Sequence, residues 1–152
     1  MLDRPVEIVK TLRATPVVLR ALVHGIDDVG LRRRPGPGEW AIIEVVGHLA
    51  DTEERALGRV RQMLAEDNPQ LEPFDQEALA VQRRYLDLDL QAELARLEEL
   101  RGQHVALLEA VDGPGWKRTG RHGEHGELTL ELYETHVAAE EVDHLAQIAR
   151  LL

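Results

Sequence analysis

Cysteine is absent from this chain of 152 residues. A chain without cysteine can form no disulfide framework and offers no thiol nucleophile of its own. If the protein uses a thiol in a reaction, that thiol must therefore come from a co-substrate.

A net positive charge is also lacking. The chain carries 18 lysine and arginine residues against 28 aspartate and glutamate residues, which gives a formal net charge of −10. Such a charge repels phosphate backbones and anionic lipid surfaces. The single basic run, residues 32–34, is too short to reverse this field and is interpreted as a solvated turn. We expect neither a nucleic-acid partner nor a membrane partner.

Long apolar runs are missing as well. No stretch approaches the length of a membrane span, and the first residues, MLDRPVEIVK, lack the basic region and apolar core of a signal peptide. We therefore expect a cytoplasmic protein. The length is typical of one domain, which we expect to span residues 1–152.

The apolar residues that are present recur at three- and four-residue spacing, and the β-branched alternation of strands is missing. The pattern predicts an all-α protein. Helices are expected over about 5–25, from 39 or 40 to 66, and over about 75–85, 90–111 and 129–150. Pro16 is expected to kink or restart the first of them, and Thr129 is expected to cap the last. Residues 112–127 are expected to form a loop. Four long amphipathic helices form a four-helix bundle, which places ligand sites on facing helices.

The last of these helices contains the segment ETHVAAEEVDHLAQI, residues 134–148, with three possible metal ligands along one edge of its apolar stripe. Residues four apart on a helix are separated by about 6 Å along the axis, close enough to share one ion. His136 and His144 are about 12 Å apart, which is too far. The pair of ligands is therefore either Glu140 with His144 or His136 with Glu140.

His48 lies beside the apolar stripe of the helix predicted from 39 or 40 to 66. Together with a glutamate and a histidine from the last helix it would complete a set of two histidines and one carboxylate. Such a set suits Zn, Ni, Fe(II) or Mn and leaves positions open for water and substrate. The alternative is a hydrogen-bonded surface cluster without a metal.

Several other polar residues need an interpretation. Glu141 falls near the middle of the apolar stripe, so its carboxylate is expected to orient a histidine ring or to face an arginine from a neighbouring helix. Asp51, one turn after His48, could orient that ring or be solvated. The remaining histidines are predicted to lie outside any site, partly exposed or solvated: His24, His104, His122 and His125.

Two segments resemble a known family. EWAIIEVVGHLADTEE, residues 39–54, is similar to the pattern W-S-x-x-E-x-x-x-H-x-x-D-x-E of the DinB-like superfamily, which includes metal-dependent hydrolases of the YfiT type and bacillithiol or mycothiol transferases. HGELTLELYETHVAAEEVDHLAQI, residues 125–148, is similar to the ending of that family, G-x-x-T-L-x-E-L-x-x-H-x-x-x-H-[DE]-x-x-H-x-x-Q-I.

The resemblance implies an up-down-down-up four-helix bundle that is often dimeric, so we expect a homodimer. It also implies a divalent metal ion, with Zn or Ni favoured, held by His48, Glu140 and His144. Glu140 stands where the family has histidine, which leaves a carboxylate that can still bind a metal. Ala41 stands where the family has a serine that would form a capping box with Glu44.

The implied function is that of a metal-dependent enzyme acting on small molecules, as an S-transferase that uses a low-molecular-weight thiol or as a hydrolase. A coordinated thiol is deprotonated at neutral pH and becomes a nucleophile, and the same ion could activate water. Glu141 or Asp51 is then the candidate general base. The rival interpretations are a non-catalytic, stress-associated metal-binding protein and a helical interaction module without metal.

Overall fold

The computed structural model describes residues 3–152, and helices account for most of them. The elements are, in chain order, α1 (Arg4–Val23), α2 (Asp28–Arg32), α3 (Ile42–Ala65), α4 (Gln76–Gln82), a 3₁₀ turn (Tyr85–Asp87), α5 (Leu90–Glu109), α6 (Gly113–Trp116), β1 (Thr119–His122), β2 (Gly126–Thr129) and α7 (Leu130–Arg150). The four long helices α1, α3, α5 and α7 are those that the sequence predicted.

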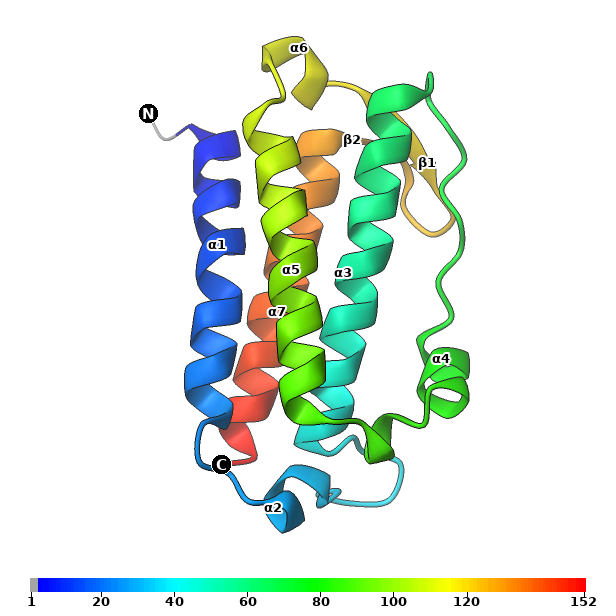
Figure 1. The fold of residues 1–152 in the computed structure, drawn as a ribbon. Coiled ribbons are helices and arrows are strands. Elements are labelled where there is room, and N and C mark those ends of the chain that lie inside the picture. Colours follow the sequence, from blue (N-terminus) through cyan, green and yellow to red (C-terminus); the bar gives the residue numbers. More distant parts are fainter. Residues whose placement is uncertain (1–2) are drawn as a thin grey trace.

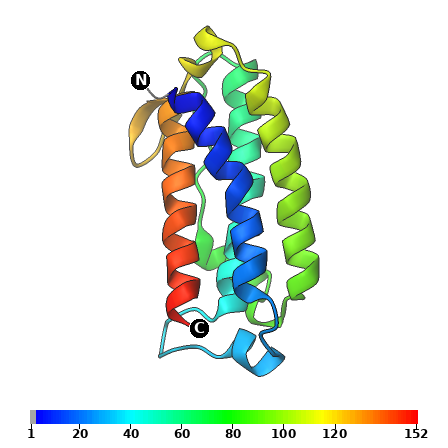
Figure 2. The same ribbon diagram turned by 90° about the vertical axis from the view of Figure 1, so that its left-hand side faces the viewer.

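The direction of each helix confirms the up-down-down-up bundle (Figure 1). α1 and α7 run one way and pack side by side, while α3 and α5 run the other way and also pack together (Figures 1 and 2). A parallel pair needs a connection that returns along the bundle. Residues 66–75 supply it, because this extended segment runs back beside α3 to α4 (Figure 1).

Local sequence signals explain where the helices begin. Thr129 caps α7 as predicted, since its hydroxyl accepts the backbone N–H of Leu132 at 3.1 Å. α3 lacks a side-chain cap at Ala41, but the Glu44 carboxylate accepts the Ala41 N–H and so keeps half of a capping box. α1 continues through Pro16 without a break.

The loop predicted over residues 112–127 is in fact partly ordered, which corrects the sequence prediction. It contains α6 and the antiparallel pair of β1 and β2, which the sequence did not reveal because both strands are only four residues long. The hairpin is joined to the returning segment, since the Leu71 N–H donates to the Arg121 carbonyl and the Arg121 N–H donates to the Pro69 carbonyl. The hairpin and this segment therefore form one wall beside α3.

The core consists of two apolar clusters. One gathers around Leu12, Val60 and Leu130, and the other around Leu19, Val46 and Ile148. Buried polar side chains occupy the same helices at an intermediate level: Thr15, Glu53, Arg101, His104, Glu134 and Glu141, which we call the polar layer. Within the part of the chain that the structure describes, no helix combines the length and the apolarity needed to cross a membrane.

Candidate metal centre

His48 and His144 meet between α3 and α7. Their Nε2 atoms lie 3.1 Å apart, and their rings cross at 72° with centroids separated by 4.7 Å. The side-chain oxygen of Gln147 lies 2.9 Å from Nδ1 of His144. A proton on Nδ1 would donate to Gln147 and leave the lone pair of Nε2 free. The structure thus brings together two of the three predicted metal ligands.

The chemical state of these rings suits a divalent ion. Burial and, to a smaller extent, the nearby His144 lower the pKa of His48 to about 4, and Asp51 opposes the shift. His48 is therefore neutral near pH 7, and a neutral imidazole is the form that binds a metal. Two imidazole nitrogens bound to one tetrahedral zinc ion at about 2.0–2.1 Å lie about 3.3 Å from each other. The observed 3.1 Å fits that arrangement.

Glu140 precedes His144 by one turn of α7. Its exposed side chain lines a cavity of about 590 Å³ that is also lined by His48. Across residues 3–152, no group of three or more histidine, aspartate and glutamate side chains is arranged to hold a metal ion. The two histidines are in place, whereas the third predicted ligand lies on the wall of the adjoining cavity.

His136 lies one turn before Glu140 and associates with the hairpin. Its ring stacks on that of His125, with centroids 5.0 Å apart and planes inclined by 11°. His122 lies beside His125, and all three rings line the same cavity as His48. His125 is exposed, as the sequence predicted, but His122 is partly buried. The structure therefore groups His136 with the hairpin.

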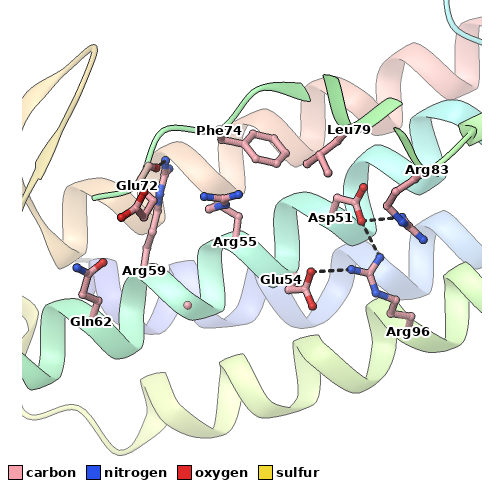
Figure 3. Close-up of a pocket in the computed structure, with 11 residues that line it drawn as sticks. Asp51, Glu54, Arg55, Arg59, Gln62, Glu72, Phe74, Leu79, Arg83 and Arg96 are labelled. Atoms are coloured by element: carbon pink, nitrogen blue, oxygen red, sulfur yellow. Dashed lines mark hydrogen bonds and ion pairs between the residues drawn. The ribbon is translucent and has the colours of Figure 1, made fainter. Parts of the chain in front are cut away.

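Asp51 is turned toward α4 and α5 (Figure 3). Arg83 and Arg96 donate to its Oδ1 atom over 2.6 and 2.8 Å, and the Tyr85 hydroxyl donates to Oδ2. The side chain is buried, so the alternative of a solvated carboxylate is wrong. Because both oxygens are occupied, these contacts favour a structural role over the predicted role as a general base.

Glu141 is also engaged in the interior. Arg101 donates to one carboxylate oxygen, and the Thr15 hydroxyl donates to the other at 2.8 Å. Burial raises the pKa of Glu141, and the charge of Arg101 opposes that shift. Of the two partners that the sequence left open, the structure selects the arginine. Glu141 does not line the cavity beside His48, which favours a structural role here too.

His104 was predicted to be partly exposed, but it is fully buried, and this prediction is wrong. Its Nδ1 lies 2.7 Å from Glu53 and its Nε2 lies 2.7 Å from Glu134. Although burial disfavours the charged ring, these carboxylates raise the pKa of His104 to about 10. One signal was available, because His104 falls on the inward stripe of α5, seven residues after Leu97 and four before Leu108.

The comparison with family models agrees with this architecture. The model of the DinB superfamily matches residues 11–148, from the first helix to the end of the last. The chain belongs to the DinB superfamily.

Relatives within the DinB superfamily extend over nearly the whole chain. "Putative metal-dependent hydrolase GK0616" of Geobacillus kaustophilus is 32% identical over 146 residues, which cover 95% of this chain and 82% of that protein. YfiT of Bacillus subtilis is 29% identical over 93% of this chain and 82% of its own length.

The fold of this DinB superfamily member is also seen in a solved structure. It is that of Bacillus subtilis YfiT, described as "a probable metal-dependent hydrolase with an unusual four-helix bundle topology". The two structures share 28% identity and a TM-score of 0.84, over 96% of this chain and 86% of that one.

Proposed function

We propose that this protein is a metal-dependent enzyme acting on small molecules, with the ion held by His48, Glu140 and His144. The observation that carries the proposal is the approach of the two Nε2 atoms, 3.1 Å apart, from helices that are distant in the sequence. When bound there, a divalent ion supplies Lewis acidity, which makes a coordinated thiol or water a nucleophile at neutral pH.

The residues around the histidines support this function. Gln147 orients the His144 ring through its Nδ1 atom. The rings of Trp40 and Phe74 lie 5.1 and 6.2 Å from that of His48, and the His48 side chain is buried, which limits the access of water to it. The cavity of about 590 Å³ has the volume of a small-molecule site and leaves room for a substrate beside Glu140.

We favour thiol transfer over hydrolysis as the reaction. The chain supplies no thiol of its own, and the two candidate general bases, Asp51 and Glu141, are held in ion pairs. A thiol held by the ion would depend less on such a base than water would, because the pKa of a free thiol is already closer to neutrality than that of water. Hydrolysis is the alternative, and it is the activity that the names of the relatives describe.

Metal content tests the site directly. Protein purified without a nickel column should contain about one divalent ion per chain by elemental analysis. His144→Ala should contain almost none, and Glu140→Ala should bind the ion far more weakly. Glu140→His should retain binding and shift preference toward Zn or Ni, because imidazole is a softer ligand than carboxylate.

His136→Ala is the matched control for this experiment. It removes a cavity histidine from the same helix, about 12 Å from His144, and should leave the metal content unchanged. Loss of the ion from His136→Ala but not from Glu140→Ala would show that the wrong side chain of α7 was chosen.

Activity then separates the two reactions. Conjugation of a small thiol to 1-chloro-2,4-dinitrobenzene should require the bound ion and should disappear in His144→Ala. Metal-dependent release of p-nitrophenol from p-nitrophenyl acetate, without thiol conjugation, would instead assign hydrolysis.

A further inference from the structure

Two arginines follow His48 on the same face of α3. Arg55 and Arg59 come seven and eleven residues after His48, which turns each of them only about 20° away from it around the helix axis. Both residues line the cavity that His48 lines. Along the helix axis Arg55 is about 10 Å beyond His48 and Arg59 about 16 Å beyond it.

Aromatic rings and backbone carbonyls hold the two side chains in place. The Cζ atom of Arg55 lies 5.1 Å from the centre of the Phe74 ring, and that of Arg59 lies 5.8 Å from the centre of the Tyr133 ring. Arg55 donates to the Pro73 carbonyl and Arg59 to the Glu72 carbonyl. Each guanidinium has five N–H donors, so most of them stay available after these contacts.

Neither arginine makes a salt bridge within 4.0 Å among residues 3–152. The contrast with Arg83 and Arg96 is clear in Figure 3, where both of these are paired with Asp51 while Arg55 and Arg59 lie apart from that group. The Nε atom of Arg59 is also buried without a hydrogen-bond partner among the described residues.

Two neighbouring arginines without salt bridges are unexpected in a chain with a net charge of −10. The acidic residues of the cavity have other positions: Asp75 caps α4, Glu124 lies in the hairpin turn, and Glu140 is on α7 beside the histidines. The positive charge of the cavity is therefore concentrated on the α3 wall, at the end away from His48.

We propose that Arg55 and Arg59 bind a carboxylate of the small-molecule ligand. Arginine pairs with carboxylates through two parallel hydrogen bonds, a geometry that suits a planar anion. The Phe74 ring lies near both His48 and Arg55, 6.2 Å from the His48 ring and 5.1 Å from the Cζ atom of Arg55, and offers an apolar surface for the body of the ligand. The ligand is thus a carboxylic acid whose other end reaches the histidines.

This inference rests on the proposed function only in placing the reactive end of the ligand at His48. The alternative role of the two arginines is purely structural, namely to hold residues 72–73 against the bundle through hydrogen bonds to their carbonyl groups. The two roles differ in one measurable respect, because a purely structural role does not create affinity for carboxylates.

Calorimetric titration with hexanoate and with its neutral amide tests the carboxylate site. Wild-type protein treated with a chelator should bind hexanoate and should bind hexanamide at least about tenfold more weakly, since a charge-assisted pair is lost. The double variant Arg55→Gln/Arg59→Gln should lose at least about tenfold in hexanoate affinity and keep its metal content. Arg61→Gln is the matched control, because this exposed arginine of α3 lies outside the cavity and should leave hexanoate binding unchanged.

His144→Ala separates this inference from the proposed function. It should lose the ion and keep hexanoate binding, so failure of the metal site and failure of the carboxylate site give different results. Absence of hexanoate binding to wild-type protein, equal binding by the double variant, or tighter binding of inorganic phosphate would overturn the carboxylate assignment. If the double variant lacks the wild-type helical circular dichroism, Arg55→Lys and Arg59→Lys decide the question, because lysine keeps the charge without the planar fork.

Discussion

His48 and His104 are both buried in the same bundle, yet their pKa values move in opposite directions. The pKa of His48 falls to about 4, while that of His104 rises to about 10. Burial lowers both, but His48 faces a second imidazole and aromatic rings, whereas His104 lies between the carboxylates of Glu53 and Glu134. Because burial acts on both rings in the same direction, the difference between their charge states comes from their partners.

The groups around the two histidines also differ in how their charges are paired. In the polar layer nearly every charged group has a partner of opposite sign, as Arg101 has in Glu53 and Glu141. Around His48, by contrast, the group that faces the ring is the His144 imidazole and not a carboxylate. A region whose charges are paired internally supports the fold, whereas two neutral imidazoles that face each other are suited to binding a metal ion.

The largest expected effect comes from breaking the polar layer. Arg101→Met leaves the Glu141 carboxylate buried without a cation and removes one of the two cationic partners of Glu53, so it should lower the free energy of unfolding by about 3–5 kcal/mol. Urea denaturation measures this loss. Arg61→Met, on the exposed face of α3, should change stability by no more than about 0.5 kcal/mol. A similar small change for Arg101→Met would show that the layer does not stabilise the fold.

The second prediction concerns the pH dependence of stability. Because the pKa of His104 is raised in the folded state, its contribution is complete below about 6.5 and is lost as the pH rises toward 10. The free energy of unfolding should therefore fall from pH 6.5 to 9, by at most about 1.4 kcal/mol per pH unit. Denaturation curves at several pH values should show this slope in wild-type protein and in His24→Gln, which alters an exposed histidine, but not in His104→Gln.

The smallest effect on folding is expected at His48, although its effect on metal binding should be complete. His48→Ala should remove the ion and lower stability in the presence of chelator by no more than about 1–2 kcal/mol, because no ion pair is broken. His104→Ala should do the reverse, keeping the ion and losing more stability. Elemental analysis measures the metal content of both variants, and urea denaturation measures their stability. Retention of the ion by His48→Ala would contradict the assignment of His48 as a metal ligand.

Much of the fold could be predicted from the sequence. The three- and four-residue spacing of apolar side chains located all four long helices, and the residues around His48 and His144 resembled those of the DinB-like family. The hairpin of β1 and β2 was missed because its strands are too short to show alternation and are paired with each other and with residues 70–71. The pairing with residues 70–71 joins segments about fifty residues apart, which local patterns do not contain.

For the candidate site, the sequence determined where each side chain lies along its helix and on which face, because the helical repeat fixes the spacing of the side chains. It placed Glu140 and His144 one turn apart and His48 at the edge of its stripe. Only the tertiary structure decided what each side chain meets: His144 for His48, Arg101 for Glu141, two arginines for Asp51 and two glutamates for His104. The physical reason is that a polar side chain on an inward stripe must find its partner on another helix, and that partner depends on how the helices pack.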